Sequence, residues 1–341
     1  MNAPSSKKSS SERRKRNAVI AIFALVGSTL LLFADVAPRR ILHIADYEHN
    51  FEHNVVAWLR PVTDNDTPVY WHIPKSGGTS MKLYYSCMGL ATASEVGVDG
   101  HDKDETIEVL ENWHGIKNIN VDTTTKEGLI RAGKLGLAES GLADVVFTSY
   151  PSEAVDIFNP INKGAFFSLF RHPNERTVSL FYFIQIASWQ GKTYTPHLKN
   201  MKLEDWLRKD RVKCTQGNVM TRLLIGKYKK ACVITEEELQ MAKDVLRRKF
   251  TIGLMSKMEE SVERFDRRFG WYDNEKRQQC FDSHIKVGDN KNPHKEVKEG
   301  SEAWKLLTEM NSVDIRLYEY AVKLFELQKD QNRIRGITQQ A

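Results

Sequence analysis

Short apolar runs alternate along the chain with longer stretches in which apolar positions recur at helical spacing. Four runs are short and rich in β-branched or aromatic residues, which predicts buried strands at residues 69–73, 143–148, 165–170 and 250–255. Helical patterns predict helices at residues 81–88, 104–113, 127–137, 236–249, 257–269 and 301 to about 329. Strands that alternate with helices predict a three-layer α/β fold with a mainly parallel central sheet.

The N-terminal pattern differs from the rest. Residues 18–34 form an uncharged, mostly apolar run of 17 residues, just long enough as a helix to cross a hydrocarbon core of about 30 Å. A basic cluster precedes it, so we interpret it as a transmembrane signal-anchor with the C-terminal body in the lumen. A cleaved signal peptide remains the alternative, because Ala34 and Ala37 leave a cleavage site open.

This interpretation divides the chain into five parts. Residues 1–17 are a basic cytosolic tail, residues 18–34 the anchor, and residues 35–66 a stem with a helix-like stretch at 55–59. Residues 67–330 form the main domain, and residues 331–341 are a C-terminal tail. Asn65 begins an N-glycosylation pattern, although Pro68 follows it directly.

Charge and cysteine content narrow the class of protein. The net charge is +6, but the first 17 residues hold six basic residues and one acidic residue, so the rest of the chain is close to neutral. The basic pI therefore gives little support to nucleic-acid binding. Four cysteines permit two disulfides in a luminal body; Cys214 with Cys232 is preferred on local spacing, and buried free thiols, above all Cys87, remain open.

The strand at residues 69–73 runs into a glycine loop and the start of a helix. Such a turn directs free backbone N–H groups, and the positive end of the helix dipole, at one place. A lysine before the glycines adds a cation, so the loop suits a phosphate or sulfate group. Because the lysine precedes the glycines, this is not the nucleotide-triphosphate loop. The predicted anion site consists of Lys75, Ser76, Gly77, Gly78, Thr79 and Ser80.

A second anion-binding pattern follows the strand at residues 165–170. Arg171 ends that strand, Pro173 permits a helix to start, and Ser179 lies about two turns inside the helix. An arginine and a serine so placed can bracket one phosphate, because arginine gives bidentate charge-assisted bonds and serine gives a hydroxyl. Arg176 is a secondary candidate, and His172 is adjacent. His72, in the first strand, is interpreted as a core histidine.

Together these two patterns resemble those of sulfotransferases that use 3′-phosphoadenosine 5′-phosphosulfate (PAPS). The chain looks most like the membrane-anchored carbohydrate sulfotransferases, including the heparan sulfate 2-O and 6-O types. The resemblance covers residues 67–330 in patches, among them 218–224 and 311–325. In that family the first loop holds the 5′-phosphosulfate, and the residues matching Arg171 and Ser179 hold the 3′-phosphate.

The resemblance implies a P-loop-like sulfotransferase fold and sulfuryl transfer from PAPS to a carbohydrate hydroxyl. It further implies a type II Golgi membrane protein with its catalytic domain in the lumen, with PAPS as co-substrate and no metal. Lys75 would stabilise the leaving phosphate. The resembling enzymes commonly carry a histidine just after the strand that matches residues 143–148, but here the chain reads Ser149-Tyr150-Pro151. The catalytic base is therefore unassigned, with candidates Glu95, His101, His114 and Glu153.

Two other readings stay open on the sequence alone. One is another phosphate-binding transferase of the nucleotide kinase type, against which the missing triphosphate loop counts. The other is a luminal binding protein with an inactive sulfotransferase fold, which the missing histidine motivates. The sequence identifies neither the acceptor nor the oligomeric state.

Overall fold

Seven strands form one sheet in the order β3-β4-β2-β5-β1-β6-β7. The computed structural model describes residues 49–95, 101–228, 233–289 and 294–339, and residues from Asn50 onward belong to one compact unit. All neighbouring strands are parallel except the β3–β4 pair, which is antiparallel. The strands are β1 (Thr67–Trp71), β2 (Thr92–Ala93), β3 (Val109–Glu111), β4 (Lys117–Ile119), β5 (Val145–Thr148), β6 (Gly164–Phe170) and β7 (Phe250–Leu254). The predicted α/β class with a mainly parallel sheet is confirmed.

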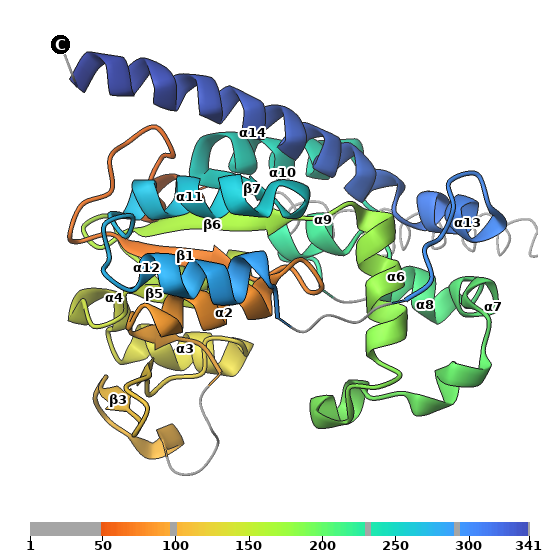
Figure 1. Cartoon of the computed structure of the whole chain (residues 1–341), viewed down its shortest axis with the longest axis horizontal. Coiled ribbons are helices and arrows are strands. Elements are labelled where there is room, and N and C mark those ends of the chain that lie inside the picture. The colour runs from red at the N-terminus through yellow and green to blue at the C-terminus, as the bar shows by residue number, and fades with distance from the viewer. Residues whose placement is uncertain (1–48, 96–100, 229–232, 290–293, 340–341) are drawn as a thin grey trace, which may run out of the picture. The chain divides into compact units, whose positions relative to one another are not determined.

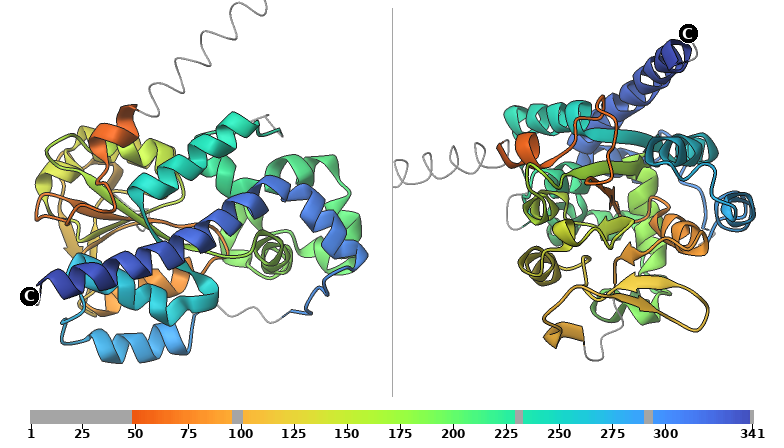
Figure 2. Two further views of the ribbon diagram at one scale, coloured as in Figure 1. Left: turned by 90° about the horizontal axis from the view of Figure 1, so that it is seen from above. Right: turned by 90° about the vertical axis from the view of Figure 1, so that its left-hand side faces the viewer.

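Helices cover both faces of the sheet (Figures 1 and 2). One face carries α2 (Gly78–Cys87), α11 (Met258–Phe269) and α12 (Arg277–Cys280), and the opposite face carries α3 (Lys126–Lys134), α5 (Pro151–Ala154) and α10 (Glu236–Lys249). The remaining α-helices are α4 (Leu137–Ser140), α6 (Pro173–Phe183), α7 (Leu203–Leu207), α8 (Asp210–Gln216), α9 (Val219–Leu224), α13 (Glu302–Met310) and α14 (Ser312–Gln339). Most of the longer helices begin and end within a few residues of the predicted bounds.

The 3₁₀ and π turns are short connectors between these elements. They are η1 (His101–Lys103), η2 (Val155–Ile157), η3 (Ser188–Thr193), η4 (Pro196–Asn200), η5 (Met255–Lys257) and η6 (Phe281–Lys286). Two of them, η3 and η4, follow α6 and carry the chain away from the sheet before α7 begins (Figure 1).

Aromatic side chains from three adjacent strands form the core under α2 and α11. The ring of Tyr70 lies 5.1 Å from that of Phe147 and 5.2 Å from that of Phe167, and all three are buried. Phe167 in turn packs edge-on against Phe265 of α11. Burying one such side chain contributes about 1.5–3 kcal/mol, so this cluster holds α2 firmly against the sheet.

One disulfide ties the end of α2 to α12. Cys87 and Cys280 are bonded across 193 residues of sequence. Local spacing therefore failed to find this pair, and the prediction that Cys87 could be a free thiol is wrong. Cys214 is also disulfide-bonded, but its predicted partner Cys232 lies outside the described residues.

Residues assigned to the stem belong in part to the globular body. Phe51, Val55 and Val56 are buried, and the ammonium group of Lys249 binds the main-chain oxygen atoms of Glu52 and Val55. Residues 55–59 are not helical as predicted, because Val55 instead bridges the start of β6. The tail, the predicted anchor at 18–34 and stem residues 35–48 lie outside the described residues.

Two helix predictions need correction. Residues 104–113 contain strand β3 and no helix. Asn112 accepts two backbone N–H bonds in the tight turn that leads from β3 into β4. The long C-terminal helix is divided at Asn311, which is buried and binds Asn174 and Thr177 of α6. The amide oxygen of Asn218 then accepts the first backbone N–H groups of α14, whose helix continues to residue 339.

Candidate functional site

The loop between β1 and α2 has a backbone that only a few residue types adopt readily. Gly77 has φ of 83°, which suits glycine, but Lys75 has φ of 68°, in the left-handed region that side chains with a Cβ avoid. Among the described residues only Lys75 and Asn218 combine a positive φ with a side chain. Strained backbone clusters at ligand and active sites, so this loop is a candidate site.

Gly78 is needed at the first position of α2 for a steric reason. A Cβ added there would lie 2.1 Å from Cδ2 and 2.2 Å from Nε2 of His72. The imidazole therefore packs directly on the backbone at the helix N-terminus. His72 is partly buried, and burial, assisted by the charges of Lys82 and Lys75, lowers its pKa to about 4. At neutral pH it is an uncharged wall of the loop, consistent with the predicted core role.

The N-terminus of α2 presents unused hydrogen-bonding groups. The helix has no side-chain cap at Gly77 and no acidic residue in its first turn, so its dipole and free N–H groups stay available. The hydroxyl of Ser76 is fully buried and has no hydrogen-bond partner among the described residues. Thr79 is exposed beside it, while Ser80 accepts a hydrogen bond from the backbone N–H of Asp289 at 2.8 Å. A buried, unpaired hydroxyl at a helix N-terminus fits a tetrahedral anion.

Lys75 supplies the positive charge of this loop. Its ammonium nitrogen lies 3.5 Å from the centre of the Phe183 ring, at the end of α6. Burial, and to a smaller degree the charge of Arg171, lowers the pKa of Lys75 to about 8. The described structure thus holds a cation whose charge is stabilised by an aromatic face and which an anion would stabilise further.

The two predicted phosphate-binding patterns come together. One guanidinium nitrogen of Arg171 donates a hydrogen bond to the backbone oxygen of Lys75 at 3.2 Å, although the residues are 96 apart in sequence. Strand β6 lies beside β1, so both end at the same edge of the sheet. Arg171 also contacts Glu175, and Ser179 lies one helical turn further along that face of α6 and is buried.

The two neighbouring candidates have structural roles. Arg176 is buried in the interior, where its guanidinium group binds the hydroxyl of Thr177 and the backbone oxygen of Gln216. His172 caps α6 through a hydrogen bond from the backbone N–H of Asn174, and its ring stacks on Trp304 at 5.4 Å. Both hold α6 in place, and α6 in turn positions the predicted phosphate-binding residue Ser179.

The four candidates for the base lie in different surroundings. Glu95 is exposed just after β2, and its charge acts on Lys82 of α2. His101 is paired with Asp104 at 3.0 Å, away from the loop on η1. His114 is exposed in the β3–β4 turn. Glu153 lies on α5, beyond the end of β5, and belongs to a hydrogen-bonded cluster described below. The structure therefore leaves two carboxylates, Glu95 and Glu153, at the carboxyl ends of the parallel strands.

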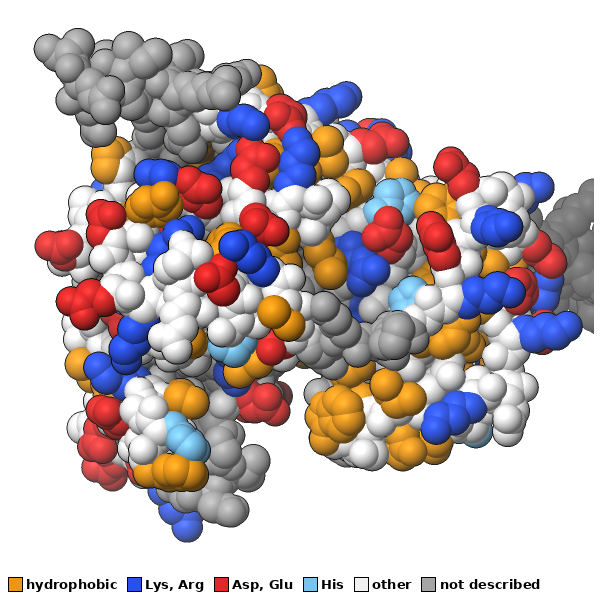
Figure 3. Space-filling view, viewed as in Figure 1, with side chains coloured by type: hydrophobic (Ala, Val, Ile, Leu, Met, Phe, Trp, Pro, Cys, Tyr) orange, Lys and Arg blue, Asp and Glu red, His pale blue; other side chains and the backbone are white. Residues whose placement is uncertain are grey.

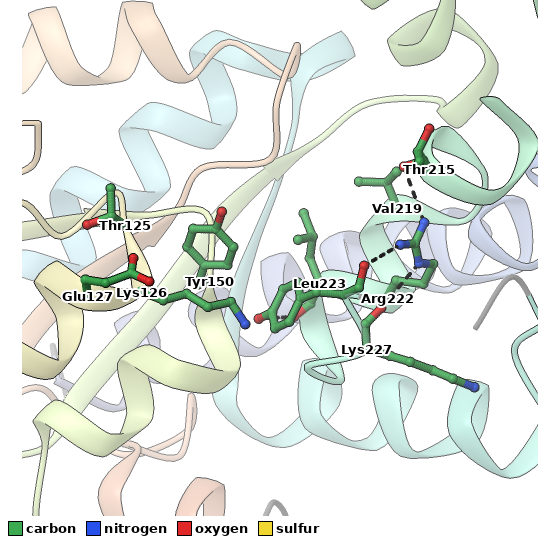
Figure 4. Close-up of a pocket in the computed structure, with 10 residues that line it drawn as sticks. Thr125, Lys126, Glu127, Tyr150, Thr215, Val219, Arg222, Leu223 and Lys227 are labelled. Atoms are coloured by element: carbon green, nitrogen blue, oxygen red, sulfur yellow. Dashed lines mark hydrogen bonds between the residues drawn. The ribbon is translucent and has the colours of Figure 1, made fainter. Parts of the chain in front are cut away.

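A pocket of about 530 Å³ opens next to Glu153 (Figure 4). Lys126 reaches across it from the N-terminus of α3, and its ammonium group lies 3.3 Å from the centre of the Tyr228 ring and pairs with Glu153. Tyr150 packs edge-on against Tyr228 at 5.3 Å. The lining residues are Thr125, Lys126, Glu127, Tyr150, Thr215, Val219, Arg222, Leu223, Lys227 and Tyr228. Sequence reasoning missed this pocket, because its walls come from four separate segments.

Apolar side chains are exposed close to Lys75. Trp189 is 67% exposed and packs against Phe183, the residue that supports the lysine ammonium. Ile186 and Tyr194 are exposed in the same segment after α6. Figure 3 shows hydrophobic side chains gathered at lower right, in the part of the molecule that follows α6. A hollow separates this part from the one at lower left, which carries β3. Lys75 thus borders a group of exposed apolar side chains, a feature that can mark a binding surface.

Three negative findings complete the site. Among the described side chains, no group of three or more His, Cys, Asp or Glu residues is arranged to hold a metal ion. Within the described part of the chain, no helix has both the length and the apolar character required to cross a membrane, and the predicted span lies outside that part. No protein-family model and no curated protein matches the sequence.

Proposed function

We propose that the chain transfers a sulfuryl group from PAPS to a carbohydrate hydroxyl. The observation that carries this proposal is the hydrogen bond from Arg171 to the Lys75 backbone, which brings two anion-binding elements together at one sheet edge. One nucleotide with phosphates at both ends of its ribose can contact both elements. Ligands of parallel α/β sheets bind at this edge, beyond the carboxyl ends of the strands.

The two elements have distinct roles. The backbone N–H groups of residues 76–80 and the hydroxyl of Ser76 would bind the 5′-phosphosulfate, as the unpaired, buried Ser76 oxygen supports. Arg171 and Ser179 would bind the 3′-phosphate, which explains why an arginine and a serine share this end of α6. This two-ended recognition distinguishes PAPS from ATP, which has no 3′-phosphate.

The reaction is an in-line displacement at sulfur. The acceptor oxygen forms a new S–O bond, and the bond from sulfur to the bridging phosphate oxygen breaks, leaving 3′,5′-adenosine bisphosphate. Lys75 moves from the Phe183 ring to the bridging oxygen, where its positive charge stabilises the charge that develops on the leaving phosphate. A carboxylate takes the hydroxyl proton, with Glu95 and Glu153 as the two placed at the right edge.

The proposed compartment is the Golgi lumen, with the chain anchored as a type II membrane protein by residues 18–34. The Cys87–Cys280 disulfide supports an oxidising compartment, since such bonds rarely persist in the cytosol. An inactive, binding-only relative of the same fold is the second candidate, because Tyr150 stands near the place where resembling enzymes carry a histidine.

Two measurements on the full chain test the proposal. A thermal-shift titration should show stabilisation by 3′,5′-adenosine bisphosphate, little by 5′-AMP, and none by ATP with or without Mg²⁺. Incubation with ³⁵S-labelled PAPS and a panel of glycans should then label at least one glycan. Stabilisation by ATP alone would overturn the donor assignment. Nucleotide binding without labelling of any acceptor would support the binding-only candidate instead.

A further inference from the structure

The pocket lies one strand away from the phosphosulfate loop. Its wall residue Tyr150 follows β5, the strand that neighbours β1. The segments that follow these two strands remain hydrogen-bonded to each other. The backbone N–H of His72 donates to the backbone oxygen of Thr148 at 2.7 Å, and the hydroxyl of Ser149 donates to the backbone oxygen of His72 at 3.1 Å. A ligand in the pocket would therefore be held beside the loop that carries Lys75, by a part of the chain fixed to it.

The pocket combines aromatic rings with a connected set of polar groups. The hydroxyl of Tyr228 and that of Ser152 lie 2.8 Å apart, and both contact the carboxylate of Glu153. Lys126 completes this set, pairing with Glu153 while its ammonium covers the Tyr228 ring. A sugar unit has the matching chemistry, since its C–H faces pack on aromatic rings and its hydroxyls exchange hydrogen bonds with carboxylates, amines and hydroxyls.

The charges of the pocket decide which kind of sugar fits. Each cation that lines it already has partners: Lys126 pairs with Glu153, and Lys227 pairs with Glu238 at 2.9 Å and points away from the pocket in Figure 4. The guanidinium group of Arg222 donates hydrogen bonds to backbone oxygen atoms, including that of Cys214 at 2.7 Å. An acidic sugar or a sulfated one would thus find no unpaired cation among these lining residues, and the carboxylate of Glu127 at the rim would repel it.

From these observations we infer that this pocket is an acceptor subsite for one uncharged sugar unit. The inference rests on the proposed function, because it assigns the pocket to the acceptor of that reaction. A neutral glycan would pack one unit against the pocket side of Tyr150 and extend a hydroxyl-bearing unit along the sheet edge toward Lys75. Polyanionic acceptors would be disfavoured at this position.

Direct glycan binding tests the subsite without requiring turnover. The full chain, purified in mild detergent and fluorescently labelled, is applied to an array with neutral, uronate-containing and sulfated oligosaccharides. We expect the signal to concentrate on neutral glycans. The variant Tyr150→Ala should lower that binding at least about tenfold by removing one aromatic wall. Trp113→Ala, which removes an 88% exposed aromatic ring in the β3–β4 turn, should leave it unchanged.

A second variant reverses the charge preference. Glu153→Gln keeps the shape of the cluster but removes the charge that neutralises Lys126, so binding of uronate-containing glycans should rise about fivefold or more. Preference of the unaltered protein for acidic glycans, or unchanged binding in Tyr150→Ala, overturns the subsite. Absence of any glycan binding in protein that still binds 3′,5′-adenosine bisphosphate overturns the subsite alone. Glycan binding without nucleotide binding overturns the donor site alone.

Discussion

The left-handed backbone at Lys75 allows a test that separates stability from catalysis. Lys75 has φ of 68°. An L-residue in this region costs about 1–2 kcal/mol, whereas glycine adopts it freely and loses about 0.5–1 kcal/mol of chain entropy instead. Lys75→Ala keeps a Cβ in the unfavourable region, and Lys75→Gly removes it. We therefore expect Lys75→Gly to be about 1 kcal/mol more stable than Lys75→Ala.

Removal of the Lys75 side chain has two opposing effects on the free energy of unfolding, and both variants share them. Its partial burial disfavours the charge, as the lowered pKa of about 8 shows, so removal of the ammonium relieves a cost. Its contact with the Phe183 ring contributes about 0.5–2 kcal/mol to stability, and this contribution is lost when the side chain is removed. Since these effects oppose each other, Lys75→Ala should be close to the unaltered protein in stability. Lys75→Gly should then melt about 2–4 °C higher than Lys75→Ala.

Catalysis, unlike stability, should respond in the same way in both variants. Loss of one charge-stabilising donor costs about 10²–10³ in rate, so both variants should lose transfer of ³⁵S from PAPS to that extent. Scanning calorimetry and the transfer assay are run on both proteins. Equal or reversed melting temperatures of the glycine and alanine variants would refute the argument from backbone strain. Unchanged turnover in either variant would refute the role of the ammonium group.

Four other outcomes are expected. Arg171→Ala should weaken 3′,5′-adenosine bisphosphate about 100-fold by calorimetry yet leave 5′-AMP nearly unaffected, because only the 3′-phosphate loses its partner. Affinity for the bisphosphate should fall about fivefold between pH 8 and pH 9, as Lys75 loses its proton above its pKa of about 8, and Lys75→Arg should remove this fall. Gly78→Ala should abolish binding and lower the melting temperature, because its Cβ would lie 2.1 Å from an imidazole carbon. Glu95→Gln should lower kcat at least 100-fold if Glu95 is the base, whereas Glu153→Gln should lower it less than tenfold.

The pH dependence of stability has a definite sign. In the unfolded chain the ammonium of Lys75 keeps its proton up to its ordinary pKa of 10.5, whereas the folded protein releases it near pH 8. Between these values the unfolded state binds more protons, so the Lys75 contribution to the free energy of unfolding rises with pH. The same group thus stabilises the free protein and weakens anion binding as pH rises above 8.

The sequence predicted what depends on local chemistry. Residues 69–80 read correctly as strand, glycine loop and helix, since proline, two glycines and an apolar run each have one usual role there. The strained φ of Lys75 could not be predicted, because no local pattern marks a lysine for the left-handed region. The same holds for strands β2, β3 and β4, which are two or three residues long and too short for a periodic pattern.

Contacts between residues far apart in the sequence were the second feature that the sequence could not predict. The Arg171–Lys75 contact could be expected only from the resemblance, since the two residues are 96 apart and meet through the pairing of β1 with β6. The Cys87–Cys280 bond spans 193 residues, so local spacing could not identify it. No single segment contains enough of the pocket to identify it. In each case the information lies in the order of strands in the sheet.

The proposed donor half of the site matches the patterns of the family that the chain resembles, whereas the inferred acceptor half departs from them. The chemistry of the two ligands explains this difference. The proposed donor, PAPS, is one molecule with fixed ends, so in our proposal the loop after β1 and the arginine after β6 have to match it. The inferred acceptor half lies beyond β5, where Tyr150 follows the strand and Glu153 is held by Lys126, Ser152 and Tyr228. Both carboxylate oxygens are already engaged, one by the ammonium of Lys126 and the other by the hydroxyls of Ser152 and Tyr228. In the proposed reaction Glu153 is therefore better placed to hold the acceptor, and the exposed Glu95 after β2 is our candidate for the base.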